Sequence, residues 1–201
     1  MIETLEKLRK NYPAPKPRSL AKQLVRLDKH CRHFIGLAPF LVIATAGKDG
    51  RVDASPRGGA PGFVRVVDDT TLHLPDALGN NRLDSFTNIV QTGNIGLIFF
   101  VPGMDETLRV NGKAKLRDEA ELLRQFPHER HPPRIVVEIA VEEAYLHCAK
   151  ALMRSKLWAP DHRIERSAFP SMGQMIRDQS GSPEPVETQA EAVARDRKSV
   201  V

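Results

Sequence analysis

The spacing of hydrophobic positions changes near residue 40. Before that point, apolar side chains recur at intervals of three and four residues, which is the period of a helix with one buried face. This spacing predicts a helix that is capped by Ser19 and ends near Gly36. The apolar positions that carry the pattern are Leu20, Leu24, Leu27, Cys31 and Phe34.

After residue 40, short apolar runs alternate with turn residues, a pattern typical of antiparallel strands. Three hairpins are expected, over residues 40–55, 62–74 and 94–116, followed by a long strand over 134–146. Six or seven short strands joined mainly by hairpins predict a mainly β fold, a small antiparallel barrel with flanking helices. The helices expected between and after these strands cover residues 81–90, 118–126 and 148–158.

The two ends of the chain differ in composition from its middle. Residues 1–18 are polar and proline-rich and predict a lead-in arm, 19–176 a single domain, and 177–201 a polar tail. The formal net charge is +5, and the first 35 residues hold nine Lys and Arg against three acidic residues. The basicity therefore belongs to the N-terminal arm, which could contact phosphate backbones or be a solvated helix face.

Several classes of protein are not expected from this composition. The longest apolar runs are far shorter than the roughly 20 residues that span a membrane, and the first residues do not resemble a signal peptide. We therefore expect a soluble, cytoplasmic protein. Two cysteines, Cys31 and Cys148, are too few for a disulfide framework, and neither belongs to a Cys-x-x-Cys pair. No metal site and no Gly-x-Ser-x-Gly nucleophile are predicted.

Three polar segments at the ends of predicted strands carry the candidate chemistry. In the first, a strand ends in Ser55-Pro56-Arg57 and opens into a glycine-rich loop. Free backbone amides together with a guanidinium match the oxygens of a phosphate, although an ordinary hairpin connection would have the same composition.

The second segment covers residues 75–85 and leads into the helix predicted over 81–90. Either Asn80 or Asn81 is expected as its N-cap, which places Arg82 in the first turn. A cation there opposes the helix dipole unless an anion is present, so this position indicates an anion site.

The third segment, residues 106–113, alternates in polarity. Thr107, Arg109 and Asn111 fall on one face of the strand, while Leu108 and Val110 fall on the other. An exposed strand face would look the same, and only together with the first two segments does this one indicate a binding groove.

These segments, in this order and spacing, resemble a known family. The matching stretches are Ser55-Pro56-Arg57-Gly58, residues 61–66, Leu72-His73-Leu74-Pro75, residues 79–85 and residues 107–112. Over roughly Phe40 to Trp158 the chain resembles the pyridoxamine 5′-phosphate oxidase-like superfamily of FMN-binding split barrels. The resemblance implies a six-stranded split barrel, a homodimer, and two FMN sites at the dimer interface.

The resemblance also implies roles for individual residues, although the basic C-terminal motif that grips substrate phosphate in pyridoxamine phosphate oxidases is not reproduced. It places a strand with Ala54, Ser55, Pro56 and Arg57 along the flavin ring and ribityl chain, and a second strand edge with Leu74 and Pro75 against the flavin. It places Asn81 and Arg82 on the phosphate. From later in the chain it adds polar contacts from Thr107 and Arg109 and an aromatic contact from Trp158.

The sequence thus predicts an FMN-dependent oxidoreductase with a small-molecule substrate that it does not specify and no assignable catalytic residue. Two other classes stay open at this point. One is a non-catalytic module that senses or stores flavin or haem, or binds nucleic acid through its arm. The other is a reductase that uses deazaflavin F420 on the same fold.

Overall fold

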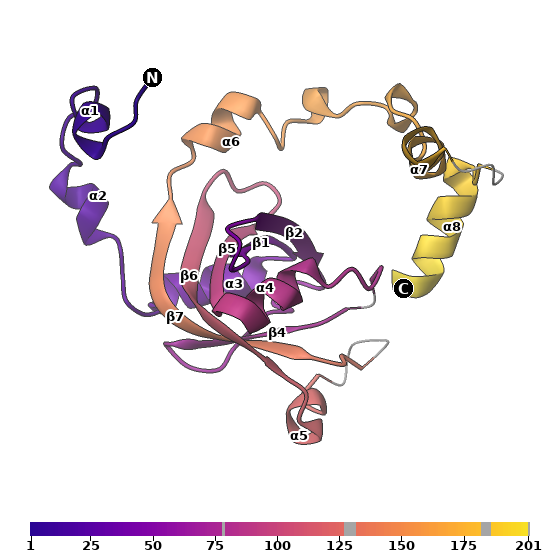
Figure 1. Cartoon of the computed structure of the whole chain (residues 1–201), viewed down its shortest axis with the longest axis horizontal. Helices are drawn as coiled ribbons and strands as arrows, with labels where there is room; N and C mark the ends of the chain where they lie inside the picture. The colour runs from indigo at the N-terminus through magenta and orange to yellow at the C-terminus, as the bar shows by residue number, and fades with distance from the viewer. Residues whose placement is uncertain (78, 127–131, 182–185, 201) are drawn as a thin grey trace.

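A computed structural model of the chain describes residues 1–77, 79–126, 132–181 and 186–200. Its seven strands form one antiparallel sheet in the order β2-β1-β5-β6-β7-β4-β3. The sheet curls around itself without closing, which makes a split barrel with flanking helices (Figure 1). The strands are β1 (Phe40–Ala46), β2 (Val52–Gly58), β3 (Arg65–Val66), β4 (Thr71–Pro75), β5 (Asn94–Phe100), β6 (Thr107–Arg117) and β7 (Val136–His147).

The three predicted hairpins and the long strand after them are confirmed. Alternation of apolar and polar residues located these strands well, because one face of each packs on the core. The strand count is seven instead of six, because Arg65–Val66 pairs with β4 as a short edge strand.

The core lies on the concave side of the sheet. Leu41 and Ile43 of β1 and Phe99 of β5 are completely buried there. Two helices, α3 (Lys29–Leu37) and α4 (Asp84–Thr92), pack against the strands and contribute apolar side chains to the same cluster.

The helix predicted over residues 20–36 is wrong in its first half. Leu24 is extended and pairs with Ala144 of β7, through hydrogen bonds of 2.9 and 2.8 Å that a helical backbone could not make. Helix α3 begins only after Asp28, whose carboxylate accepts hydrogen bonds from the backbone of His30 and Cys31. Ser19 is not its cap and lies inside the short helix α2 (Pro17–Ala21).

Both ends of the chain carry helices. The N-terminal arm holds α1 (Leu5–Arg9) and α2, neither of which buries a side chain. After β7 come α6 (Lys150–Ser155), the 3₁₀ turns η1 (Pro160–His162) and η2 (Arg166–Ala168), α7 (Met172–Ser180) and α8 (Gln189–Val200). Another helix, α5 (Ala120–Leu123), is shorter than the one predicted over 118–126. The stretch predicted as a polar tail is therefore helical at residues 177–180 and 189–200.

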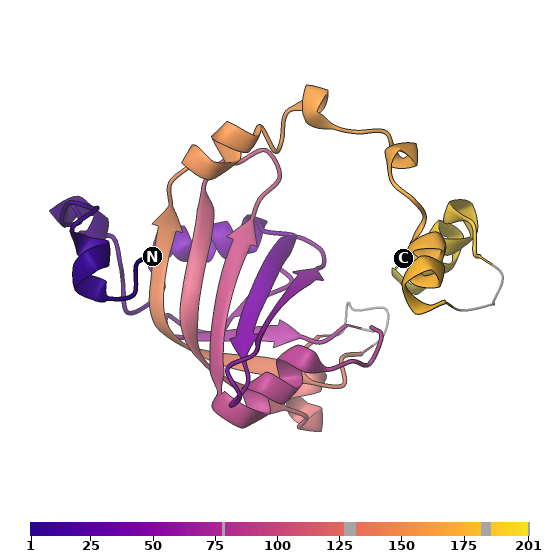
Figure 2. The same ribbon diagram turned by 45° about the horizontal axis from the view of Figure 1, so that its top comes forward.

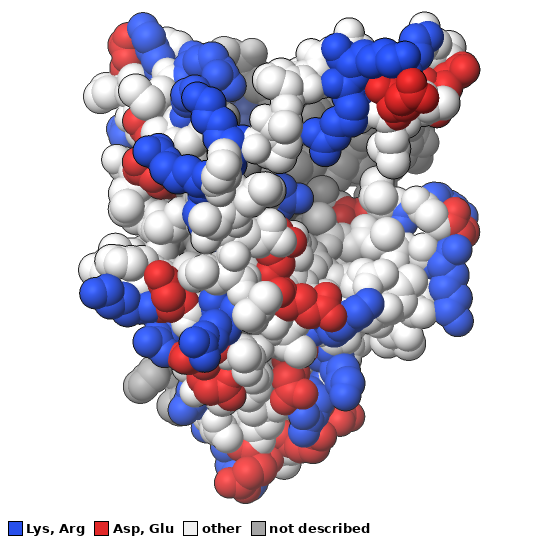
Figure 3. Space-filling view, turned by 90° about the vertical axis from the view of Figure 1, so that its left-hand side faces the viewer, with Lys and Arg blue, Asp and Glu red and all other residues white. Residues whose placement is uncertain are grey.

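The surface on the side of α1 and α2 has no unbroken basic patch. Figure 3 shows Lys and Arg gathered toward the top of this face and mixed with Asp and Glu below. No helix in the described part of the chain is long and apolar enough to cross a membrane. Of the cysteines, Cys31 is buried, which raises the pKa of its thiol to about 11, and Cys148 is exposed.

Candidate functional site

A cavity of about 530 Å³ opens between β2, the end of β4 and the start of α4. Polar and charged side chains line much of it, and six of the eleven predicted cofactor-binding residues are among them. We call these six residues the pocket group: Ser55, Pro56, Arg57, Pro75, Asn81 and Arg82.

Arg57 is the most enclosed cation of the pocket group. It pairs in register with Leu41, so its side chain lies on the concave side of the sheet. Its Nη1 donates hydrogen bonds to Ser55 Oγ at 2.5 Å and to the Pro56 carbonyl at 2.8 Å. Burial lowers the pKa of Arg57, and the carboxylates of Asp76 and Asp53 oppose that effect. A partly desolvated guanidinium of this kind gains from an anionic ligand.

The cavity also holds carboxylates, which were not among the residues predicted from sequence. Asp53 accepts a hydrogen bond of 2.5 Å from Ser85 Oγ at the start of α4. Burial raises the pKa of Asp76, and nearby Arg57 and Arg134 partly oppose this shift. Asp53 could have been found from its period-two spacing with Ser55 and Arg57, because all three share one face of β2.

The loop before α4 corrects the prediction for Asn80, Asn81 and Arg82. Helix α4 begins at Asp84, so neither asparagine is its cap and Arg82 precedes the first turn. Asn80 Oδ1 instead accepts a hydrogen bond from the Arg82 backbone at 3.1 Å. The exposed Arg82 side chain pairs with Asp84 at 2.8 Å, a contact that raises the pKa of Arg82. The unfavourable dipole contact inferred from sequence is therefore absent.

Two residues of that loop have left-handed backbone conformations. Asn81 and Leu83 each have φ of 59° without being glycine. Asparagine tolerates this region, whereas leucine does so at a cost of about 1–2 kcal/mol. Such strain concentrates at functional sites, where the surrounding structure holds it in place. It brings Asn81 and Arg82 to the mouth of the cavity.

Two predicted residues of β2 and β4 lie outside the cavity lining. Leu74 is buried in the core at 1% exposure. Ala54 is exposed on the convex face of the sheet, in register with Ala44 of β1. Their side chains therefore do not contribute to the cavity.

Three further predicted residues, Thr107, Arg109 and Trp158, lie elsewhere, and we call them the distal group. Arg109 donates a hydrogen bond of 3.0 Å to Tyr145 Oη, and its guanidinium lies 5.8 Å from the centre of that ring. Trp158 Nε1 donates to the Met104 carbonyl at 2.8 Å. Thr107 is buried at the start of β6.

Arg109 of the distal group is separated from Arg57 by the sheet itself. The neighbours of Arg109 on β6, Leu108 and Val110, are completely buried, so Arg109 lies on the convex face, as predicted. Arg57 lies on the concave face, on a strand three places away in the sheet. Three strand spacings amount to about 14 Å. Within one chain, Arg57 and Arg109 therefore project from opposite faces of the sheet.

The residues that the structure describes include no candidate metal centre. Within them, no three His, Cys, Asp or Glu side chains are grouped so that they could hold a metal ion. The chemistry that the cavity supports is binding of a polar or anionic molecule between three arginines and several carboxylates.

Comparison with known proteins places this chain in a family. The family model described as pyridoxamine 5′-phosphate oxidase matches residues 27–148. The chain therefore belongs to the pyridoxamine 5′-phosphate oxidase family. No curated protein matches it at a significant level.

Solved structures support the fold alone. A variant of HupZ from Group A Streptococcus is 19% identical with a TM-score of 0.51, and the match covers 60% of this chain and 99% of that one. General stress protein 26 from Bacillus anthracis is 15% identical with a TM-score of 0.41, over 58% of this chain and 93% of that one. The second likeness is too weak to carry an argument.

Proposed function

We propose that the protein is an FMN-dependent oxidoreductase that binds FMN in the cavity of the pocket group and works as a homodimer. The observation that carries the proposal is the half-buried Arg57 in a cavity of about 530 Å³, a volume typical of cofactor sites. Family membership supports a flavin as the occupant.

The residues of the cavity fit such a ligand. Arg57 would hold the phosphate together with Ser55 and Asn81, since a charged donor beside hydroxyl and amide groups suits phosphate oxygens. The edges of β2 and β4 at Pro56 and Pro75 would lie along the flavin. When bound, FMN supplies the transfer of a hydride or electrons between a donor and an acceptor, and the chain binds and orients it.

A second copy of the chain would complete the site. Arg57 and Arg109 face opposite sides of the sheet, and Pro56, the pocket residue on the convex face, stands three strands away from Arg109. We therefore expect Arg109 to contact the FMN molecule held in the pocket of a partner. The convex face between Pro56 and Arg109 is apolar, since Val42 and Ile98 lie in register between those two residues. Beside that row, the rings of Phe40 and Phe100 are 5.9 Å apart. Phe40 is exposed and Val42 and Ile98 are partly exposed, and a sheet face of this kind suits a dimer interface.

The visible absorbance spectrum of the freshly purified protein tests the cofactor. We expect bands near about 370 and 450 nm, and release of FMN on denaturation, identified by its mass. A colourless protein that takes up no added FMN contradicts the proposal. Release of a deazaflavin or haem would keep the fold and replace the cofactor.

Sedimentation velocity tests the assembly. We expect a dimer at micromolar concentration whenever FMN is bound. A monomer that retains stoichiometric FMN would show that one chain is sufficient and would exclude the shared site.

A further inference from the structure

The chain after α6 leaves the barrel. In both ribbon views, residues 159–181 curve away from the sheet, and helices α7 and α8 lie beside it (Figure 1, Figure 2). Within the described residues, the buried core cluster ends at Ala144. We call residues 159–181 and 186–200 the C-terminal arm.

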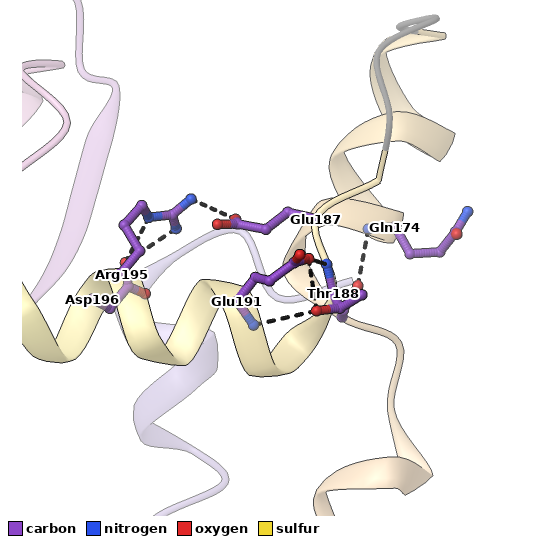
Figure 4. Close-up of polar contacts among 7 residues, drawn as sticks. Gln174, Glu187, Thr188, Glu191, Arg195 and Asp196 are labelled. Atoms are coloured by element: carbon purple, nitrogen blue, oxygen red, sulfur yellow. Dashed lines mark hydrogen bonds and ion pairs between the residues drawn. The ribbon is translucent and has the colours of Figure 1, made fainter.

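The C-terminal arm is held together by hydrogen bonds and an ion pair among its own residues. Thr188 and Glu191 form a reciprocal capping box at the start of α8, in which the Glu191 carboxylate accepts from the Thr188 backbone at 2.8 Å and the Thr188 hydroxyl accepts from the Glu191 backbone at 3.2 Å (Figure 4). Arg195 of α8 pairs with Glu187 at 2.5 Å. Arg166 of η2 donates to Gln189 Oε1 at 2.8 Å, which ties the start of the arm to its end.

The two helices of the arm also pack closely. Gly173 of α7 approaches the backbone of Glu187 so nearly that a Cβ at that position would lie 2.8 Å from the Glu187 carbonyl oxygen. Ala192 of α8 is only 5% exposed. A disordered tail would have neither feature, so this segment has a fixed shape that a partner surface can recognise.

One side of this unit is apolar and open. Phe169, Met172 and Ile176 are each more than half exposed. Met172 and Ile176 stand four residues apart in α7 and therefore share a face, while Asp178 points to the other side of the helix. A small helical pair that buries so little of its apolar surface is expected to need another surface for stability.

We propose that the C-terminal arm packs this apolar face of α7 against the barrel of a second copy of the chain. The inference rests on the homodimer proposed above. The same chain carries two apolar surfaces that it does not cover itself, the arm and the convex face with exposed Phe40 beside partly exposed Val42 and Ile98. A twofold dimer buries matching surfaces of both copies at once. The arm extends outward instead of covering its own barrel, which leaves it available to the partner.

Photo-crosslinking of the full chain tests this arrangement. A benzophenone label is attached to Ile176→Cys in a Cys148→Ser background, in which the remaining Cys31 is buried. Labelled chains are mixed with ¹⁵N-enriched unlabelled chains, allowed to exchange, and irradiated. We expect covalent dimers whose crosslinked peptides join a ¹⁴N α7 to a ¹⁵N barrel strand. The matched control is Asp178→Cys in the same background, for which such crosslinks should be several-fold fewer.

The outcomes distinguish a failure of the arm proposal from a failure of the proposed homodimer. Crosslinks confined to one chain, or equal yields from positions 176 and 178, in a sample that sediments as an FMN-containing dimer would overturn the arm proposal and leave the proposed function intact. A monomer with bound FMN would contradict both. As a second measurement, Ile176→Arg should raise the dimer dissociation constant about tenfold or more, while Asp178→Ala leaves it within about twofold. An unchanged constant for Ile176→Arg would also overturn the proposal.

Discussion

The pocket group and the distal group contain residues of similar chemistry in different surroundings. Arg57 is half buried in a cavity, bonded to its own strand, and has carboxylates nearby. Arg109 lies on the convex face against the ring of Tyr145. The family resemblance implies that both contact one cofactor, yet the sheet separates them. If Arg57 and Arg109 both contact one cofactor, as the proposed function requires, we expect two chains to supply them.

The largest expected effect is at the pairing of β6 with β7, because β6 carries Thr107 and Arg109 of the distal group. A Cβ at Gly112 would lie 2.0 Å from the Ala140 carbonyl oxygen of β7, where the register of β6 and β7 shifts. Because backbone cannot yield as a side chain can, Gly112→Ala should lower the free energy of unfolding by roughly 3 kcal/mol. Urea denaturation measures it.

The matched control is Gly36→Ala in α3, where an added Cβ meets nothing within 4 Å. That variant should be neutral or slightly more stable, because alanine is the better helix former. Equal stability of the Gly112 and Gly36 variants would mean that the backbones of β6 and β7 are not as close as the structure has them. The placement of Arg109 on β6 would then also be wrong.

Within the pocket group, Arg57→Ala should have the largest effect on FMN affinity. Loss of a charged hydrogen bond costs about 1.5–3 kcal/mol, or roughly 10- to 150-fold in the dissociation constant. Fluorescence titration of the apoprotein with FMN measures this loss. Arg51→Ala, in the exposed turn before β2, serves as the control and should change little. Matching losses in the two variants would remove Arg57 from the site.

Arg82→Ala distinguishes the mouth of the cavity from its interior. The Arg82 side chain is exposed and already paired with Asp84, so we expect only about a two- to fivefold loss of FMN affinity in the same titration. A loss as large as that of Arg57→Ala would show that Arg82 leaves Asp84 to bind the phosphate directly.

The smallest effect is expected at Asp76, and it depends on pH. Burial raises the pKa of this carboxyl in the folded state, so the folded chain binds its proton more tightly than the unfolded chain does. The free energy of unfolding therefore falls as pH rises from the pKa of Asp76 in the unfolded chain, about 3.9, through its pKa in the folded chain. Below about pH 3.9 the carboxyl is protonated in both states and this loss of stability is absent.

Asp76→Asn should accordingly gain stability over the wild type at about pH 7 and show little difference near about pH 3. Urea denaturation at both values tests the sign. A variant that is less stable at about pH 7 would show that attraction to Arg57 and Arg134 outweighs the cost of burial.

The strands could be predicted because alternation reports directly which face is buried. The placement of Arg109 opposite Leu108 and Val110 followed from that rule alone. The start of α3 could not be predicted in this way, because the long-range pairing of Leu24 with Ala144 overrides a helical pattern. The position of Arg82 depends on a loop with left-handed Asn81 and Leu83, which no periodicity indicates. Helix α8, in contrast, has a readable signal in residues 188 and 191, because a threonine three residues before a glutamate is typical of a capping box.

Subunit mixing tests whether the two groups, which the sheet separates in one chain, meet between two chains. Arg57→Ala and Arg109→Ala are prepared separately, each shown to bind FMN weakly, then mixed and allowed to exchange subunits. If each site takes Arg57 from one chain and Arg109 from the other, half of the dimers are mixed and each contains one intact site. We expect high-affinity FMN binding to return to roughly one quarter of the sites. Mixed dimers that bind no more FMN than either variant alone would contradict a site shared between two chains.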